Sequence, residues 1–228
     1  MVLADRSTPE SQGYDLIVQQ LVPGYASLAR LAVALLAVSP LAGREQASVL
    51  VAGCGTGAEL LEARAQRPDW QVTAIDPSAA MLTIARGRLA EDADTIQWQQ
   101  TTVEALEADE RFDGALSVLV LQSLRDDGSK LAFLTALARS LKPGGQLVLV
   151  DLMAPERSPL QQQVDAAWVG FQNASGIKAD TAVAGLTQGV HPIGGNRLAA
   201  LVEAAGFSDP APIFQALNVQ GFLLQKLP

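Results

Sequence analysis

The chain has 228 residues, of which 49% are hydrophobic, so it can bury one core without help from disulfides or structural metals. Acidic residues outnumber basic ones by 24 to 16, and the net charge of −8 has the wrong sign for direct binding of nucleic acid. One cysteine and one histidine exclude an internal disulfide and a Cys/His zinc site, and they favour a reducing, cytoplasmic setting. The longest apolar run, 31–38, is too short to cross a bilayer, and acidic and basic side chains interrupt the first residues where a signal peptide would lie.

Short β-branched runs alternate with longer helical patterns, which favours a mostly parallel sheet with helices on both faces. In chain order, strands are expected at Ser48–Ala52, Gln71–Ile75, Thr95–Gln99, Gly114–Leu119, Gln146–Val150, Ala211–Phe214 and Asn218–Leu224. Helices are expected at Ala58–Gln66, Ser78–Ala90, Gly128–Leu141 and Asn196–Ala205. The last two strands are only a few residues apart, so they should pair antiparallel and close one edge of the sheet.

Turn chemistry sets the expected boundaries of these elements. Ser78 in Asp76-Pro77-Ser78 offers an N-cap for the helix that follows, and Lys142-Pro143-Gly144-Gly145 is expected to stop a helix and reverse the chain. Two further segments look helical: Pro9–Val38, interrupted at Pro23-Gly24, and Pro159–Gly189.

In open α/β sheets the ligand lies beyond the carboxyl ends of the strands, and both helical segments could cover that crevice. We therefore expect one domain over residues 1–228, with a helical cap at residues 1–45 and a helical insertion at residues 155–190.

The strongest chemical signal is the glycine-rich loop that follows the first strand. Gly53, Gly55 and Gly57 alternate between a buried strand and a helix start, where glycine permits a tight turn and close approach of a ligand to the main chain. Asp76 ends the next strand about 20 residues further on, where doubly wound folds place a carboxylate for ribose hydroxyls. The two features together predict a nucleoside site, although a plain connecting turn and a helix-capping aspartate are the simpler explanation of each alone.

The spacing of Gly53, Gly55 and Ala58 also satisfies a relaxed dinucleotide fingerprint. The further glycine at position 57 instead opens the loop for a ligand without pyrophosphate. A nicotinamide enzyme would need a Tyr/Lys or His proton relay, and we find no such relay in the sequence. A nucleoside cofactor other than a dinucleotide is therefore favoured.

At this point the sequence resembles the class I S-adenosylmethionine-dependent methyltransferases. The segments that carry the resemblance, in the order of the family's motifs, are Val49–Gly57, Asp76–Ser78, Thr101–Leu106, Phe112–Leu124 and Leu141–Leu147. The resemblance implies a Rossmann-like α/β fold with a seven-stranded, mostly parallel sheet and an antiparallel last strand, with S-adenosyl-L-methionine as cofactor. The implied cofactor-binding residues are Gly53, Cys54, Gly55, Gly57, Asp76, Pro77, Thr102, Val103, Val118 and Leu119. Thr102 replaces the acid that the family uses at the adenine.

A narrower resemblance, to the carboxy-S-adenosylmethionine synthases, adds Tyr25 as a cofactor contact. It rests on Val22–Tyr25, Leu121–Leu124, Ala205–Phe207 and Phe214–Asn218 with Lys226. Val118 replaces that family's asparagine, and Leu186 replaces the arginine that holds the extra carboxylate. Because a buried carboxylate without a charge partner is costly, these departures favour the ordinary methyl donor. Two cations could substitute for that arginine, Lys178 and Arg197.

We therefore expect a methyltransferase that acts on a small molecule. Two alternatives stay open: a conversion of the cofactor like that of the carboxy-S-adenosylmethionine synthases, and a regulatory protein that binds the cofactor without catalysis. Thr102 and the lack of an obvious base keep the second one open. The apolar N-terminal helices could cover their own sheet or a second subunit in a homodimer.

No catalytic residue can be assigned from the sequence. His191 is the only imidazole, but a structural role is favoured for it. Asp151 ends the fifth strand and either touches substrate or caps the chain, and Cys54 would contact the cofactor only through its backbone. Trp168 and Phe171 share a helix face, which favours core packing over the lining of a substrate pocket.

Overall fold

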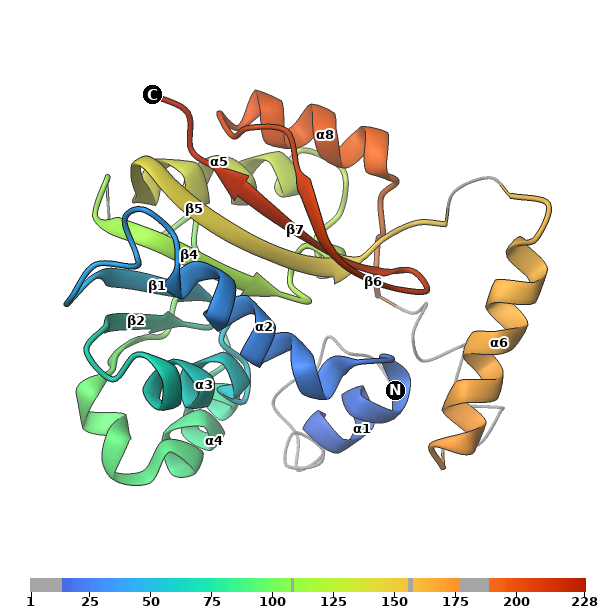
Figure 1. Ribbon diagram of the computed structural model, residues 1–228, viewed down its shortest axis with the longest axis horizontal. Helices are drawn as coiled ribbons and strands as arrows, with labels where there is room; N and C mark the ends of the chain where they lie inside the picture. The colour runs from blue at the N-terminus through green and yellow to red at the C-terminus, as the bar shows by residue number, and fades with distance from the viewer. Residues whose placement is uncertain (1–13, 108, 156–157, 177–188) are drawn as a thin grey trace.

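The computed structural model describes residues 14–107, 109–155, 158–176 and 189–228. A seven-stranded sheet with the order β3-β2-β1-β4-β5-β7-β6 forms its centre (Figure 1). The strands are β1 (Ser48–Ala52), β2 (Gln71–Ile75), β3 (Gln97–Gln99), β4 (Phe112–Val118), β5 (Leu141–Leu152), β6 (Ala211–Ala216) and β7 (Val219–Gln225). The pairs among β1 to β5 are parallel, and β7 lies antiparallel between β5 and β6. The predicted sheet class and its antiparallel edge are confirmed.

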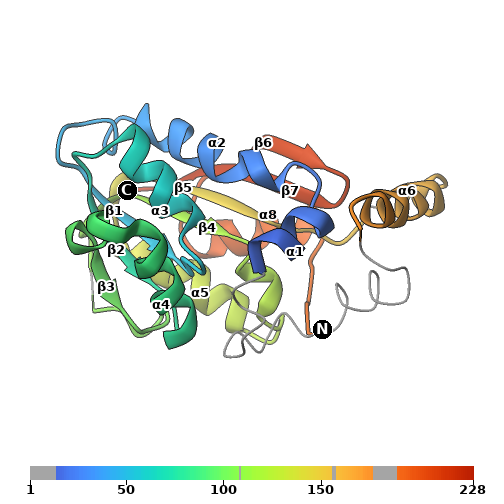
Figure 2. The same ribbon diagram turned by 90° about the horizontal axis from the view of Figure 1, so that it is seen from below.

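Helices cover both faces of this sheet, as the alternating pattern predicts. They are α1 (Tyr14–Leu21), α2 (Tyr25–Ala37), α3 (Ala58–Gln66), α4 (Ala79–Leu89), α5 (Ser129–Ser140), α6 (Gln161–Ala174) and α8 (Gly195–Ala204). Figure 2 shows α2 and α3 on one side of the sheet and α5 with α8 on the other. Helix α6 projects past the end of the β6–β7 hairpin, so it can form a wall there without covering a sheet face (Figure 1).

The core divides into two apolar clusters because neighbouring strand residues point to opposite faces. Val49 and Val51 of β1 pack in the cluster under α2 and α3, whereas Leu50 and Ala52 pack in the cluster under α5 and α8. All four are buried, as expected for a central strand covered on both faces. The strand therefore ends at a fixed position, and the loop after it starts from a rigid base.

Two predicted boundaries are wrong, each for a local reason. Residues 142–145 do not reverse the chain; they bulge out of β5 between the pairs Phe112↔Leu141 and Gly114↔Gln146. The C-terminal segment holds this bulge, since the N–H of Gly144 donates to the carbonyl of Lys226 at 3.0 Å. The third strand is shorter than predicted because residues 90–95 form the 3₁₀ helix η2 (Ala90–Thr95).

Helices α1 and α2 meet at Pro23-Gly24, as predicted, whereas the predicted helix start at Pro9 lies outside the described residues. Gly24 has a φ of 80°, and a Cβ at this position would lie 3.1 Å from the ring of Phe214 in β6. The corner between α1 and α2 thus needs a glycine for its backbone and for its contact with the sheet. None of the helices within the described residues is long and apolar enough to cross a membrane.

Candidate functional site

The three glycines of the loop after β1 all have positive φ, at 70°, 51° and 87°, but only one faces open space. A Cβ on Gly53 would lie 2.5 Å from Cγ2 of Val120, and a Cβ on Gly57 would lie 3.1 Å from Cβ of Ala85. A Cβ on Gly55 would meet nothing within 4 Å. Gly53 and Gly57 are therefore required by packing, and Gly55 is the position where a ligand can rest on the main chain. This narrows the expectation that all three glycines serve the ligand.

The amide groups of this loop are engaged by the second strand. The N–H groups of Gly53 and Cys54 donate to the carbonyl of Ile75 at 2.9 and 3.0 Å. The N–H of Gly55 donates to Oδ2 of Asp76 at 2.9 Å. A ligand on the loop consequently meets Cα atoms and carbonyl oxygens in place of these donors, which suits a cationic group better than a phosphate.

Asp76 lies directly against the glycine loop. Its side chain is buried, and its second oxygen, Oδ1, accepts a hydrogen bond from the N–H of Ser78 at 2.8 Å. Ser78 also caps α4, because its Oγ accepts from the N–H of Met81. The Asp76 carboxylate thus ties the glycine loop to the start of α4. The ribose role of Asp76 stays a prediction.

A small cavity lies over the loop. Its lining residues are Tyr25, Gly53, Cys54, Gly55, Thr56, Ala58, Glu59, Val118 and Leu119. Six of the eleven predicted cofactor residues are among them, brought from α2, from the loop and from the end of β4. Thr56, Ala58 and Glu59 were not predicted, although their place in the loop and the first turn of α3 is a usable signal.

The other predicted cofactor residues lie outside this cavity. Gly57 is turned toward α4, and its N–H donates to the carbonyl of Cys54 at 2.8 Å. Pro77 and Thr102 are exposed, and Val103 is buried in the cluster under α5. Asp76 and Pro77 follow the end of β2, and Thr102 and Val103 follow the end of β3. An extended ligand could reach these four residues from the cavity.

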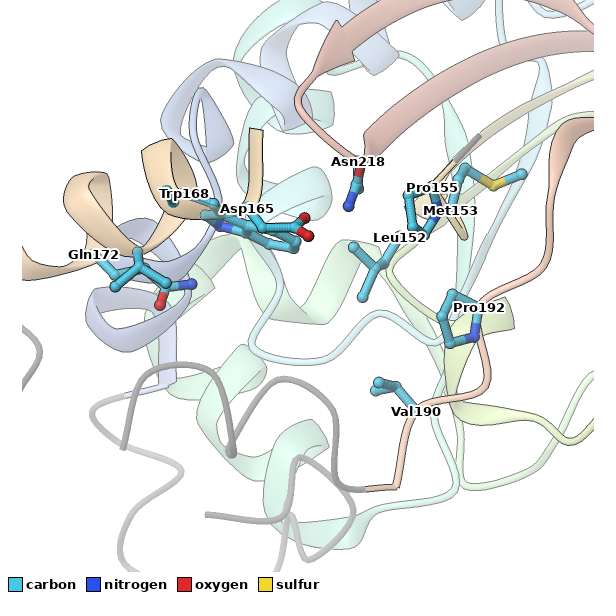
Figure 3. Close-up of a pocket in the computed structure, with 11 residues that line it drawn as sticks. Leu152, Met153, Pro155, Asp165, Trp168, Gln172, Val190, Pro192 and Asn218 are labelled. Carbon is cyan, nitrogen blue, oxygen red and sulfur yellow. The ribbon is translucent and has the colours of Figure 1, made fainter. Parts of the chain in front are cut away.

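A second and much larger cavity, of about 460 Å³, lies at the carboxyl end of β5. Figure 3 shows its walls: α6 on one side and, on the other, the end of β5, the 189–192 segment and the β6–β7 turn. Its lining residues are Leu152, Met153, Pro155, Asp165, Ala166, Trp168, Val169, Gln172, Val190, Pro192 and Asn218. The volume is in the range that holds a small organic ligand.

Trp168 forms part of this wall. Its indole Nε1–H donates to the carbonyl of Leu21 at 2.7 Å, which joins α6 to the end of α1. The half-buried Phe171 is not among the lining residues. Trp168 therefore both packs on the core and lines the cavity, whereas Phe171, on the same predicted helix face, does not line it.

Three polar side chains line the second cavity, and none was predicted from the sequence. The Asp165 carboxylate accepts a hydrogen bond from Nε2 of Gln161 at 2.8 Å. Gln172 is 1% exposed, and its carbonyl oxygen Oε1 has no hydrogen-bond partner in the described structure. Asp165, Trp168 and Gln172 recur at helical spacing on α6, a signal that could have identified this face.

Asp151 serves the framework of the site and does not reach the lining. Its Oδ1 accepts from the N–H of Gln122 at 3.0 Å and from the N–H of Leu152 at 2.8 Å. Burial raises the pKa of Asp151 to about 7, although Lys130 opposes part of this shift. Lys130 is itself buried, donates to the carbonyl of Leu121, and has a pKa lowered by burial. Of the two roles predicted for Asp151, the geometry supports capping.

His191 also has a structural contact. Its backbone N–H donates to the carbonyl of Gln122 at 2.6 Å, and its side chain is half-buried. The flanking residues Val190 and Pro192 line the second cavity, but His191 does not. The geometry therefore assigns no proton transfer to it.

Arg197, one of the two cations that could hold an extra cofactor carboxylate, is paired with another side chain. Nε and Nη2 of Arg197 each lie 2.9 Å from an oxygen of Asp126, in a bidentate pair. Lys178 and Leu186 lie outside the described residues. In the part of the chain that the structure describes, no group of His, Cys, Asp or Glu is arranged to hold a metal ion.

Comparison with known proteins finds methyltransferases that are similar to part of the chain. Residues 49–145, which hold the glycine loop, Asp76 and β4, match a family model described as a methyltransferase domain. The ubiquinone biosynthesis O-methyltransferase of Stutzerimonas stutzeri (strain A1501) is 41% identical over 109 residues, which are 47% of this chain and 44% of that protein. Residues 49–145 are therefore similar to a methyltransferase domain, as the sequence motifs predict.

Two further relatives show how far the similarity to this family extends. The demethylmenaquinone methyltransferase of Tropheryma whipplei (strain Twist) is 38% identical over 109 residues, 48% of this chain and 43% of that protein. The 1,6-didemethyltoxoflavin-N1-methyltransferase of Burkholderia thailandensis, solved with S-adenosylhomocysteine, shares the fold with a TM-score of 0.62 at 21% identity, over 100% of this chain and 94% of its own. The chain matches less than half the length of the two curated relatives. The family match contains the glycine loop but ends before the second cavity.

Proposed function

We propose that this protein transfers a methyl group from S-adenosylmethionine to a small apolar acceptor. The observation that carries the proposal is the placement of two cavities at the carboxyl ends of neighbouring strands. Leu119 lines the small cavity and donates its N–H to the carbonyl of Val150 at 2.7 Å. Leu152, two residues further along β5, lines the large one. Donor and acceptor sites would therefore lie side by side.

The residues of the small cavity fit the amino-acid end of the cofactor. The open space above Gly55 admits the ligand, and the carbonyl oxygens of the loop and the Glu59 carboxylate suit its ammonium group. The cavity itself is only about 20 Å³, so the ribose and base would extend outside it, toward Asp76 and then toward Pro77, Thr102 and Val103. Tyr25 would close the opposite side.

When bound, S-adenosylmethionine supplies a methyl group on a positively charged sulfur, and the protein's task is to align the acceptor and to exclude water. Holding two reactants in position can contribute about 7 to 11 kcal/mol to a reaction barrier. Trp168 and Leu152 would hold the acceptor from two sides, and Asp151 would keep the end of β5 in place through its bonds to Gln122 and Leu152. The proposal needs no general base, and none is assigned.

The names of the relatives support a ring-containing acceptor, since two of them refer to ubiquinone biosynthesis and to demethylmenaquinone. The matched segments, however, cover less than half of each relative, so the acceptor itself is not carried over. A cytoplasmic location remains part of the proposal, supported by the acidic composition and the single cysteine.

The alternative reaction on a carboxylated cofactor is disfavoured by Arg197, whose guanidinium is already paired with Asp126. Mass spectrometry of the ligand that copurifies with the protein distinguishes methyl transfer from the reaction on a carboxylated cofactor. S-adenosylmethionine or S-adenosylhomocysteine is expected, and a carboxylated species would overturn the proposal. Turnover of any acceptor in a metabolite screen would dismiss a purely regulatory role.

Calorimetric titration with S-adenosylhomocysteine tests the cofactor site. We expect Asp76→Ala to weaken binding at least tenfold, because each hydrogen bond to a charged group contributes about 1.5 to 3 kcal/mol. Asp69→Ala is the matched control: Asp69 precedes the same strand at its other end and likewise accepts a backbone hydrogen bond, from Gln46 at 3.1 Å. Equal affinities of the two variants would refute the ribose assignment.

A further inference from the structure

We propose that the second cavity selects its ligand by charge. It would take an apolar ring molecule that bears a hydroxyl or amino hydrogen-bond donor, and it would reject the same molecule with an anionic group. The inference rests on the proposed function, because it defines the acceptor class of that methyl transfer. It concerns residues of α6 and the segments facing it, which lie outside the matched methyltransferase segment.

The size and apolar walls of the cavity fit a ring system. Its volume of about 460 Å³ exceeds the requirement of a two-ring molecule, and most of its lining side chains are aliphatic, proline or tryptophan. Trp168 is fixed by its hydrogen bond to Leu21, so its indole presents a rigid flat surface. Leu152 and Pro155 face this surface from the end of β5 (Figure 3).

Among the described lining residues, Asp165, Gln172 and Asn218 have polar side chains; the two amides carry donors and acceptors, and the Asp165 carboxylate is an acceptor alone. Figure 3 shows the Asp165 carboxylate directed from α6 toward Asn218 and Leu152, across the cavity. Gln172 lies on the same face of α6 and also lines the cavity, but its Oε1 is enclosed by protein and is not exposed to the cavity. The acceptor open to a ligand is therefore the Asp165 carboxylate, and a ligand that donates a hydrogen bond to it would be favoured over one that cannot.

No described cation is available to balance an anion in this cavity. Its described lining contains neither lysine nor arginine, and its only charged side chain is Asp165. Two cations of neighbouring elements are occupied: Lys130 donates to the carbonyl of Leu121, and Arg197 is paired with Asp126. A carboxylate or phosphate in the cavity would meet the Asp165 carboxylate with no cation among the described lining residues to balance it.

Three probes with the same ring body test the proposal: naphthol, naphthylmethylamine and naphthoate, which are neutral, cationic and anionic. Affinities are measured by quenching of tryptophan fluorescence with the full chain saturated with S-adenosylhomocysteine. We expect naphthoate to bind about tenfold more weakly than naphthylmethylamine, with each charge contributing about threefold at a partly exposed carboxylate. Comparable affinity of naphthoate and the amine, or no binding of any probe, would overturn the proposal.

Two variants assign the effect to residues. Asp165→Asn keeps the shape of the side chain and should reduce the spread between anion and cation to about twofold. Gln172→Met replaces the enclosed amide at similar volume and should leave the spread unchanged, because its Oε1 is not exposed to the cavity. An Asp165→Asn variant that changes all the probes equally would count against a specific role of Asp165.

The control is Asp209→Asn, which removes the same charge far from the cavity. Ser208 beside it accepts the N–H of Gln225, which pairs with Gln146 at the opposite end of β5 from Leu152. This variant should leave the probe spread unchanged. S-adenosylhomocysteine affinity, measured first, separates the two hypotheses: its loss refutes the proposed function, whereas intact binding without charge selection refutes only the inference drawn here.

Discussion

The small cavity over the glycine loop and the large cavity beside α6 are built in different ways. The first is held by bonds between adjacent strand ends, such as those from Gly53 and Gly55 to Ile75 and Asp76. The second depends on contacts between distant parts of the chain, of which the bond from Trp168 to Leu21 is the clearest. The first is consequently recognisable as a sequence motif and lies within the matched methyltransferase segment, whereas the second lies outside that segment. Each prediction below bears on that contrast.

The largest expected effect concerns Asp151, which accepts a hydrogen bond from the N–H of Leu152, a residue that lines the second cavity. Because burial raises its pKa to about 7, the folded state holds a proton that the unfolded state releases near pH 4. The resulting stability is complete below about pH 4 and is lost as the pH rises through about 7. Between these limits the free energy of unfolding should fall by about 3 kcal/mol more in the wild type than in Asp151→Asn. Urea denaturation across this range measures the difference, and parallel pH profiles would contradict it.

The glycine loop offers a paired test of binding against stability. Gly55→Ala and Gly57→Ala both place a side chain at positive φ, and each should cost about 1 to 2 kcal/mol of stability. Only Gly55→Ala adds a methyl group to the open space, so S-adenosylhomocysteine affinity should fall about tenfold or more in this variant. Gly57→Ala meets Ala85 instead and should bind nearly as well as the wild type. Titration with S-adenosylhomocysteine and thermal unfolding of both variants measure affinity and stability. Weaker binding by Gly57→Ala than by Gly55→Ala would show that the ligand contacts the loop at Gly57 and not at Gly55.

The wall of the second cavity should respond more weakly. Trp168→Phe keeps an aromatic ring but removes the hydrogen bond to Leu21, with an expected loss of about 1 kcal/mol in unfolding free energy. Binding of naphthol should weaken severalfold, while S-adenosylhomocysteine affinity stays constant. If the cofactor affinity fell in parallel with that of naphthol, the two cavities would be coupled more closely than their construction indicates.

The smallest effect is expected at Gly87, in the interior of α4. A Cβ there would meet nothing within 4 Å and φ is not positive, so Gly87→Ala should stabilise the protein by about 0.5 to 1 kcal/mol. Cofactor and probe affinities should not change. A loss of stability would mean that α4 makes contacts beyond those described.

The sequence predicted the first region well because its signals are local. Strand β1, helix α3 and the position of Asp76 follow from burial patterns, glycines and caps that span a few residues each. The predictions failed where distant chain segments decide the structure. The bulge at residues 142–145 is held by the C-terminal segment. Asp165 and Gln172 line a cavity only because α6 faces the end of β5, which no local sequence pattern indicates.

Leu119 shows how the backbone limits the choice of side chain at the cofactor cavity. It has a φ of 56°, a left-handed conformation that costs a residue other than glycine about 1 kcal/mol or more. Its unbranched Cβ tolerates this, whereas the β-branched valines on either side would not. Exchanges to valine or isoleucine, which look conservative by volume and hydrophobicity, should therefore be among the least acceptable at this wall. Redesign of the cavity there has to begin from glycine, asparagine or another residue unbranched at Cβ.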